Sequence, residues 1–253
     1  MTFYNNNLNK RAGMMQPYLF PYLGYFQLIS AVDVFVLGDD LQYEKESWIN
    51  RNRILIEGKD KLITFPLKKG NHYLKINERF LSDDFSKVSD KLLRIIYNAY
   101  VKAPCFKKIF PFIEEIIKFP ELNLAKYAEN SIRRICDYLE ITTRIIPASD
   151  LSIENVIDKQ DRVIKTARKI NAQVCINLIG GMNLYNQNFF REQGIELKFH
   201  RMDHIQYKQF NNDFVPFLSI IDVLMFNEVH EVQEKLSLFT LQDHSSPEPF
   251  TIE

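Results

Sequence analysis

The strongest constraint on the fold is a regular alternation of short apolar runs with apolar stripes at helical spacing. Short apolar runs suit buried strands, and stripes at intervals of three or four residues suit helices that cover a sheet. Strands that alternate with helices form mostly parallel sheets. The sequence therefore predicts the α/β class, a mostly parallel Rossmann-like sheet with helices on both faces. The predicted strands are residues 12–15, 34–37, 143–146, 174–178 and 195–200, and the predicted helices are residues 22–31, 159–170, 184–192 and a segment within 218–226.

The middle of the chain interrupts this alternation. Residues 62–66 and 73–77 are β-like runs around a Lys-Lys-Gly-Asn-His segment, which predicts a hairpin. The apolar stripes that follow predict a helical insertion at about residues 82–140. The predicted organisation is one α/β module over residues 1–242 that carries this insertion. A polar, proline-containing flexible tail is expected at residues 243–253.

Charge and cysteine content narrow the functional classes. The 32 basic and 32 acidic residues of the 253-residue chain cancel, so no overall field attracts nucleic acid, and no nucleic-acid partner is expected. Cys105, Cys136 and Cys175 lie far apart, which predicts reduced core thiols in a cytoplasmic protein. The sequence shows neither a signal-peptide pattern nor an apolar run of about 18 to 20 residues, so no membrane span is expected.

The first candidate site follows the first predicted strand, because open α/β sheets bind ligands beyond the carboxyl ends of their strands. The segment QPYLFPYLGYF, which begins at Gln16, combines prolines, a glycine and a helix start that together suit an anion. It is similar to the HxGH loop of nucleotidyltransferases, with Tyr22 and Tyr25 at the histidine positions. We therefore expect a nucleotidyltransferase-like N-terminal unit, with Gln16 and Tyr25 near the substrate. A tightly packed turn is the alternative.

A second candidate is the polar segment that contains Trp48, the one tryptophan of the chain. On a strand, Arg51 and Arg53 share one face and Asn50 and Asn52 the other. Guanidinium groups bind carboxylates or phosphates, and amides bind sugars, so these five residues are predicted to form a ligand wall. A solvated edge strand is the alternative.

Asp39 and Asp40 end the second predicted strand. Carboxylates at such a position can bind Mg²⁺ or act as a general base. We expect Asp39 to contact the substrate and Asp40 to act in catalysis. No third acidic ligand lies nearby in the sequence, so no metal site is predicted. A turn and helix cap is the alternative.

The fourth predicted strand ends at a double glycine. Gly180 and Gly181 precede a helix start and so suggest an anion cradle, with Asn177 and Tyr185 as polar neighbours. The pattern is not a GxGxxG fingerprint, and a packing turn is the alternative reading.

The last candidates lie near the C-terminal end. His200 ends a predicted strand and is interpreted as a hydrogen-bonded structural histidine, whereas His204 is a candidate general base. Ser219 and Asp222 lie one helical turn apart and are predicted to face one site, although a helix cap explains them equally well. The sequence has no GxSxG, Walker, CxxC or HExxH motif.

The order of several segments resembles the WbqC-like family. The segments are QPYLFPYLGYFQLI from Gln16, DVFV from Asp33, DDLQY from Asp39, WINRNRI from Trp48, INLIGG from Ile176 with LY shortly after, and LSIIDVLMFN from Leu218. They match over about residues 13–228. The resemblance implies a role in bacterial O-antigen or capsule synthesis, where glycine transferase or related aminoacyl transferase activity has been suggested for the family. The matching positions are Gln16, Asp39, Asp40, Trp48, Asn50, Arg51, Asn52, Arg53, Gly180, Gly181, Tyr185, Ser219 and Asp222.

These observations lead to one functional hypothesis. The protein is expected to be a transferase that adds an amino acid, such as glycine, or a small acyl group to a nucleotide-linked amino sugar during surface polysaccharide synthesis. Its catalytic residues would be Asp40, His204 and Asp222, and activation would need ATP or another nucleotide with Mg²⁺, or a carrier thioester. Two alternatives stay open. One is a non-catalytic nucleotide-sugar-binding module of a glycan assembly complex, and the other is an aminoacyl-type transferase that modifies a nucleobase.

Overall fold

The computed structural model describes residues 9–243, and its centre is a six-stranded sheet. The strand order is β5-β2-β1-β6-β7-β8, and neighbouring strands are parallel except β7 and β8. The predicted mostly parallel sheet is confirmed. The strands are β1 (Arg11–Met15), β2 (Val34–Leu37), β5 (Arg144–Pro147), β6 (Val174–Leu178), β7 (Glu196–Met202) and β8 (Phe239–Gln242).

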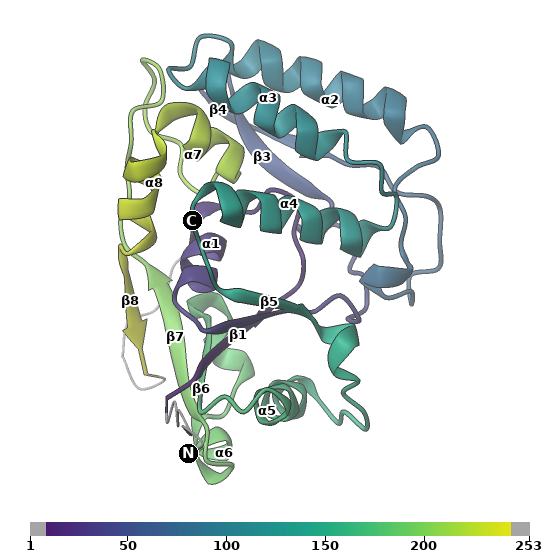
Figure 1. The fold of residues 1–253 in the computed structure, drawn as a ribbon, viewed down its shortest axis with the longest axis vertical. Helices are drawn as coiled ribbons and strands as arrows, with labels where there is room; N and C mark the ends of the chain where they lie inside the picture. The colour runs from purple at the N-terminus through teal and green to yellow at the C-terminus, as the bar shows by residue number, and fades with distance from the viewer. Residues whose placement is uncertain (1–8, 244–253) are drawn as a thin grey trace, which may run out of the picture.

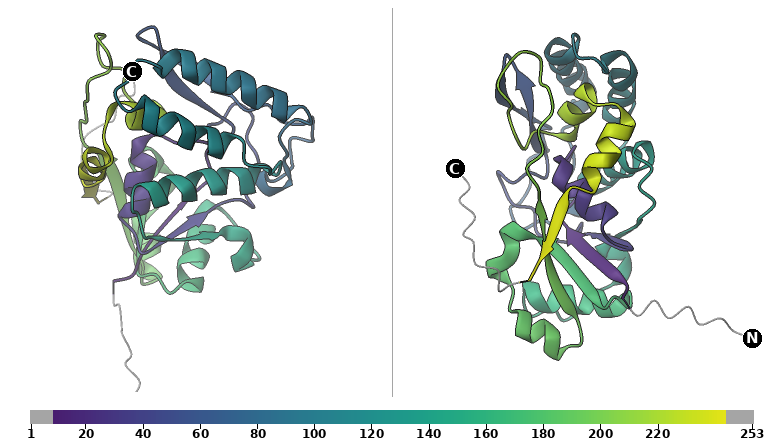
Figure 2. Two further views of the ribbon diagram at one scale, coloured as in Figure 1. Left: turned by 45° about the horizontal axis from the view of Figure 1, so that its top comes forward. Right: turned by 90° about the vertical axis from the view of Figure 1, so that its left-hand side faces the viewer.

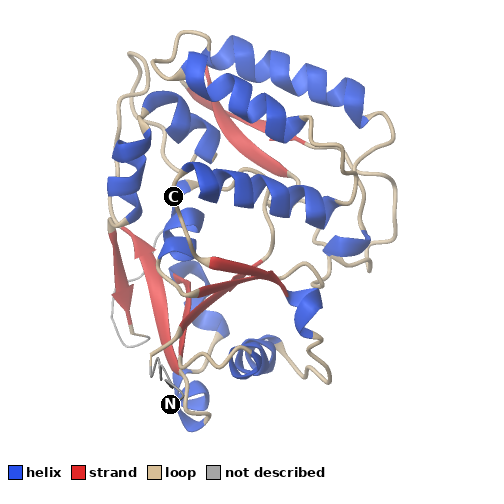
Figure 3. Cartoon of the chain, viewed as in Figure 1, coloured by secondary structure: helices blue, strands red, loops and turns tan. Residues whose placement is uncertain are grey.

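Helices cover both faces of the sheet because successive strand residues point to opposite sides. In β2, Phe35 and Leu37 enter the larger hydrophobic core, whereas Val34 and Val36 enter the smaller one. Helices α5 (Lys159–Lys169) and α6 (Gln187–Glu192) cover the smaller core, below the sheet in Figure 1. The other α-helices lie above it, as the side view of Figure 2 also shows, and Figure 3 shows the six-stranded sheet between the two groups. The predicted α/β class is confirmed.

The connection between β2 and β5 carries most of the upper layer. It contains three long helices, α2 (Phe85–Tyr100), α3 (Phe106–Ile117) and α4 (Leu124–Tyr138), within the predicted insertion at residues 82–140. Their apolar stripes join helix α1 (Leu23–Ser30) and one face of the sheet in a continuous core. The last of these helices, α4, lies directly above β5. This arrangement positions the beginning of α4 close to the carboxyl end of the sheet.

The predicted hairpin at residues 62–66 and 73–77 is wrong. The hairpin is instead formed by β3 (Arg51–Ile56) and β4 (Lys59–Thr64), which pair antiparallel around Glu57 and Gly58. Both turn residues have positive φ, at 52° and 74°, as a two-residue hairpin turn requires. Residues 73–77 form an isolated bridge to Gln42 and then the 3₁₀ helix η1 (Ile76–Glu78). The hairpin turn therefore forms at Glu57 and Gly58, and not at the longer Lys-Lys-Gly-Asn-His segment.

The C-terminal third differs from the prediction in detail. The expected helix at residues 184–192 begins only at Gln187, as α6, because Asn186 caps the helix start, and the 3₁₀ helix η3 (Ile179–Leu184) precedes it. Helix α7 (Ile220–Phe226) is followed by α8 (Val229–Leu236) and the antiparallel edge strand β8, neither of which was predicted. A further 3₁₀ helix, η2 (Ala148–Leu151), follows β5. The predicted tail at residues 243–253 lies outside the described residues beyond Asp243.

The hairpin turn provides a stability test. Gly58→Ala is expected to lower the free energy of unfolding by about 1 to 2 kcal/mol, because its φ of 74° is unfavourable for a residue with a Cβ atom. A Cβ atom there would also lie 2.8 Å from the Asn212 side chain. Gly180→Ala is the control, since its Cβ atom would meet no atom within 4 Å. Urea denaturation measures both variants, and equal unfolding midpoints would contradict the role of this turn.

Candidate functional site

The main polar cluster at the carboxyl edge of the sheet is built around Asp39, two residues after β2. Its buried carboxylate accepts the backbone N–H of Ser149 on Oδ1 at 2.9 Å. Oδ2 accepts the Ser149 hydroxyl at 2.6 Å and Asn77 Nδ2 at 3.3 Å. Ser149 lies in η2 after β5, and Asn77 lies in η1. One carboxylate therefore ties together the ends of two neighbouring strands and the segment that connects them.

Asp40, the next residue, pairs with Arg162 of helix α5. Arg162 Nη1 lies 3.1 and 3.0 Å from the two carboxylate oxygens, and the side chains are only 17% and 15% exposed. Solvent screens such a shielded pair weakly. Because both oxygens face the guanidinium, this geometry suits a positioning role for Asp40. Arg162 was not predicted, since 122 residues separate the partners and only the fold brings them together.

A pocket of about 600 Å³ opens beside Asp39, between α4 and the edge strand β5. Figure 1 shows β5 running beneath this helix. Most of this lining was not predictable from the sequence, because α4 and β5 carry no recognisable motif. Its charged lining residues are Asp39, Lys126, Glu129, Arg133, Arg144 and Asp150, and Ser149, Asn77 and Asn123 add polar groups.

The loop after β1 is held by internal hydrogen bonds. Tyr25 is fully buried, and its hydroxyl donates to the Gln16 carbonyl at 2.9 Å. Burial raises the pKa of Tyr25 well above its usual value. The half-buried Gln16 side chain accepts the Tyr18 hydroxyl at 3.3 Å. Tyr25 thus shapes this loop from inside, and the nucleotidyltransferase-like character of the unit stays a prediction.

Three residues that are predicted to contact a ligand also stabilise this loop and the hairpin through hydrogen bonds to backbone carbonyls. Asn52 Nδ2 donates to the carbonyls of Leu19 and Phe20 at 3.2 and 2.7 Å, and Ser219 Oγ donates to Phe20 at 2.8 Å. Asn50 Nδ2 donates to a carbonyl just after β4 at 2.8 Å. All three side chains are buried. Phe20 has a φ of 47°, which is costly for a large residue, and the two donors on its carbonyl stabilise that conformation.

Trp48 and its two arginines form a separate exposed surface. The guanidinium carbons of Arg51 and Arg53 lie 5.7 and 5.0 Å from the Trp48 ring centroid, so both arginines share one face of the strand as expected. Arg51 also donates to the Ser47 carbonyl at 3.0 Å, and Arg53 pairs with Asp60 at 3.3 Å. These residues do not line the pocket beside Asp39. Their role as a ligand wall stays a prediction.

The double glycine belongs to η3 rather than to the start of a long helix. A Cβ atom on Gly180 would meet nothing within 4 Å, so packing does not require glycine there. Tyr185 packs its ring against Phe190, with the centroids 5.8 Å apart. Asn177 is buried in β6, and its Nδ2 has no hydrogen-bond partner among the described residues. An anion cradle at this strand end stays a prediction.

The three predicted catalytic residues lie in three different environments. His204 is exposed after β7, which ends on the left of Figure 1, whereas β5 ends on the right. Asp222 is fully buried in α7 and accepts from Tyr100 at 2.8 Å, Tyr207 at 2.6 Å and Gln209 at 2.7 Å. Burial raises the pKa of Asp222, although these donors oppose the shift. This network joins α2, α7 and the loop after β7 inside the upper layer.

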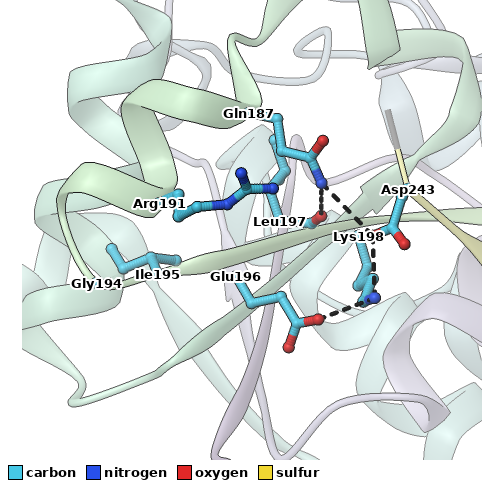
Figure 4. Close-up of a pocket in the computed structure, with 8 residues that line it drawn as sticks. All are labelled: Gln187, Arg191, Gly194, Ile195, Glu196, Leu197, Lys198 and Asp243. Carbon is cyan, nitrogen blue, oxygen red and sulfur yellow. Dashed lines mark hydrogen bonds and ion pairs between the residues drawn. The ribbon is translucent and has the colours of Figure 1, made fainter. Parts of the chain in front are cut away.

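A second pocket, of about 520 Å³, lies at the amino end of β7 (Figure 4). Lys198 pairs there with Glu196 at 2.9 Å and with Asp243 at 3.0 Å. Gln187 lies beside the Leu197 carbonyl at 3.5 Å. Because its charged groups largely neutralise one another and it lies at the opposite edge of the sheet, the pocket beside Asp39 is the better ligand site.

The acidic residues at the strand ends do not form a ready metal site. The oxygens of Asp39 face Ser149 and Asn77, and those of Asp40 face Arg162. Across residues 9–243, no three His, Cys, Asp or Glu side chains are arranged to hold an ion. The same residues include no helix with the length and apolar character needed to cross a membrane. The three cysteines are buried free thiols.

The fold and the pocket define an α/β protein whose candidate ligand site runs along the edge strand β5 and reaches the carboxyl ends of β2 and β5. The model of the WbqC-like protein family matches residues 16–234, and the chain belongs to this family. A relative, the uncharacterized protein Rv1507c of Mycobacterium tuberculosis, is 30% identical over 231 residues, which are 90% of this chain and 97% of that protein. No solved structure matches the chain.

His200 provides a pH test of the core beside the sheet. It is buried against the Phe239 ring, with centroids 4.7 Å apart, and its Nε2 has no hydrogen-bond partner among the described residues. Burial lowers its pKa from 6.5 to about 4. Between these values the unfolded chain binds a proton that the native state does not. Stability is therefore full above pH 6.5 and falls as the pH decreases toward 4.

The expected loss from this group is up to about 3 kcal/mol. His200→Phe should flatten the pH dependence of the unfolding free energy between pH 6.5 and 4, because the variant has no group to protonate there. His204→Gln is the control, since His204 is exposed and should leave that slope unchanged. Parallel slopes for the wild type and His200→Phe would contradict this assignment.

Proposed function

We propose that this WbqC-like protein is a transferase that joins an amino acid or another small acyl group to a nucleotide-linked sugar in bacterial surface polysaccharide synthesis. The observation that carries the proposal is the Asp39–Ser149 pair in the pocket at the ends of β2 and β5. Open α/β sheets bind substrates at this edge. A pocket of about 600 Å³ is within the range that small-molecule ligands occupy.

The Ser149–Asp39 hydrogen bond supports a route for the proton. The Ser149 hydroxyl donates to Asp39 Oδ2 at 2.6 Å and keeps its own lone pairs for another donor. An attacking amine or hydroxyl could therefore pass its proton to Ser149 Oγ while the serine proton moves to Asp39. Asp39 acts as the general base through this relay. The proton acceptor is thus assigned to Asp39 rather than to Asp40, whose oxygens face Arg162.

The transfer step forms one bond to the acyl carbon and breaks another. The amine nitrogen or hydroxyl oxygen of the sugar attacks the carbonyl carbon of the activated acyl donor and forms the new C–N or C–O bond. The bond between that carbon and the leaving group breaks, and its electron pair departs with the leaving group. The proton that reached Asp39 then returns through Ser149 to the leaving group. The serine–aspartate pair is regenerated for the next turnover.

The energy for this step comes from the donor. An acyl group activated by a nucleotide triphosphate with Mg²⁺, or one held as a carrier thioester, meets the requirement. The strand-end carboxylates are already engaged by protein donors, so a nucleotide would bring its own Mg²⁺ and bind it mainly through phosphate oxygens. The role of this chain is to bind and orient the donor and the sugar, and to deprotonate the attacking amine or hydroxyl.

Turnover tests the proton relay. The purified protein is incubated with nucleotide-linked amino sugars, amino acids and ATP-Mg²⁺ or acyl thioesters, and products are detected by mass spectrometry. With the productive pair, Ser149→Ala and Asp39→Asn are each expected to lower kcat by about 10²-fold, because each breaks the relay. The double variant should be no worse than about the worse single variant, since both residues act as one unit.

Thr142→Ala is the matched control, because Thr142 is an exposed hydroxyl residue before β5, at the opposite end of that strand. It should retain wild-type kcat. Full activity of Ser149→Ala would contradict the relay. Binding of a nucleotide sugar without product from any donor would favour the non-catalytic binding module instead.

A further inference from the structure

Two cations in the pocket have no hydrogen-bond or ion-pair partner among the residues that the structure describes. Lys126, in the first turn of α4, and Arg144, the first residue of β5, both line the pocket and are exposed. Across residues 9–243, neither side chain makes a hydrogen bond or an ion pair. Arg133, the third basic residue of the pocket, is instead held by Glu129 at 2.7 Å and donates to the Ile145 carbonyl at 2.9 Å. Lys126 and Arg144 are therefore free to bind an anionic ligand.

The two free cations lie at different ends of the pocket. Lys126 follows the α4 cap residue Asn123, which donates to the Asn77 carbonyl, so it lies on the same side as Asp39. Arg144 lies at the other end of β5. A strand rises about 3.3 Å per residue, so Arg144 is about 10 Å from Pro147, and Ser149 lies beyond it. This backbone spacing suits a ligand whose anionic group is separated from its reacting end.

The structure also limits what can lie along this edge strand. Arg133 covers the Ile145 carbonyl on the open side of β5, and Pro147 ends the strand without a backbone donor. Both features block the addition of a peptide strand to this edge. A small extended molecule with an anionic group suits the pocket better than a polypeptide.

We propose that Arg144 binds a phosphate group of the sugar substrate and so fixes which end of that substrate reaches Ser149 and Asp39. Arg144 is then a specificity-determining residue, with Lys126 as a second positive charge along the same ligand. A guanidinium binds phosphate oxygens through parallel hydrogen bonds. The inference rests on the proposed function for the identity of the reacting end, but phosphate binding itself does not require turnover.

The test is a calorimetric titration without any acyl donor. The probes are inorganic diphosphate, N-acetylglucosamine 1-phosphate and UDP-N-acetylglucosamine, with N-acetylglucosamine and succinate as the phosphate-free and carboxylate probes. At least one phosphorylated probe should bind the wild type, and Arg144→Gln should raise its Kd at least about 10-fold. Arg144→Lys should recover part of the lost affinity, because lysine restores the positive charge but not the paired N–H donors of the guanidinium. Arg94→Gln, which alters an exposed arginine of α2, should bind like the wild type.

The outcomes separate this inference from the proposed function. Arg144-dependent phosphate binding without product under any donor condition would support the inference and count against the transferase. Product formation with an unchanged KM for the sugar in Arg144→Gln would overturn the inference and leave the transferase standing. Failure of all phosphorylated probes to bind the wild type, or Arg144-dependent binding of succinate alone, would also overturn it.

Discussion

The pocket depends on one buried carboxylate, that of Asp39. Its bonds to Ser149 and Asn77 join the ends of β2 and β5 to the 3₁₀ turn before the helical block. Asn77 in turn receives a bond from Asn123, the residue that caps α4. Helix α4, which borders the pocket, is thus connected to Asp39 through the side-chain amides of Asn123 and Asn77. A buried carboxylate with neutral donors on both oxygens is stabilised by several hydrogen bonds, each lost if the acid is removed.

Other buried polar residues of this chain form hydrogen bonds within the protein in the same way. The loop after β1 bends through Phe20, whose positive φ leaves its carbonyl pointing into the protein, where Asn52 and Ser219 satisfy it. Asp222 is deeper still and is held by two tyrosine hydroxyls and an amide. These groups join segments that are distant in sequence. Such residues stabilise the fold around the site.

The sequence predicted the sheet well because periodicity and glycine positions are local signals. It placed β2 and β6 at the correct residues and the three long helices within the predicted insertion. It failed at the hairpin, where a two-residue Glu-Gly turn was overlooked, and at β8, whose Phe-Thr-Leu-Gln segment is short and half exposed. Of the candidate site, Asp39 and Asp40 were predictable because they end a strand. Arg162, Ser149 and Arg144 were not, since nothing in their own segments shows which strand end they will meet.

The central claim is that substrate binds between α4 and β5. A crystal structure of the protein soaked with a nucleotide-linked amino sugar tests it most directly. The account predicts ligand density along β5, with a phosphate group at Arg144 and the sugar amine or hydroxyl within hydrogen-bond reach of Ser149 Oγ. Density over the Trp48 ring beside Arg51 and Arg53, or in the pocket at the amino end of β7, with the space beside Asp39 unchanged, would contradict it.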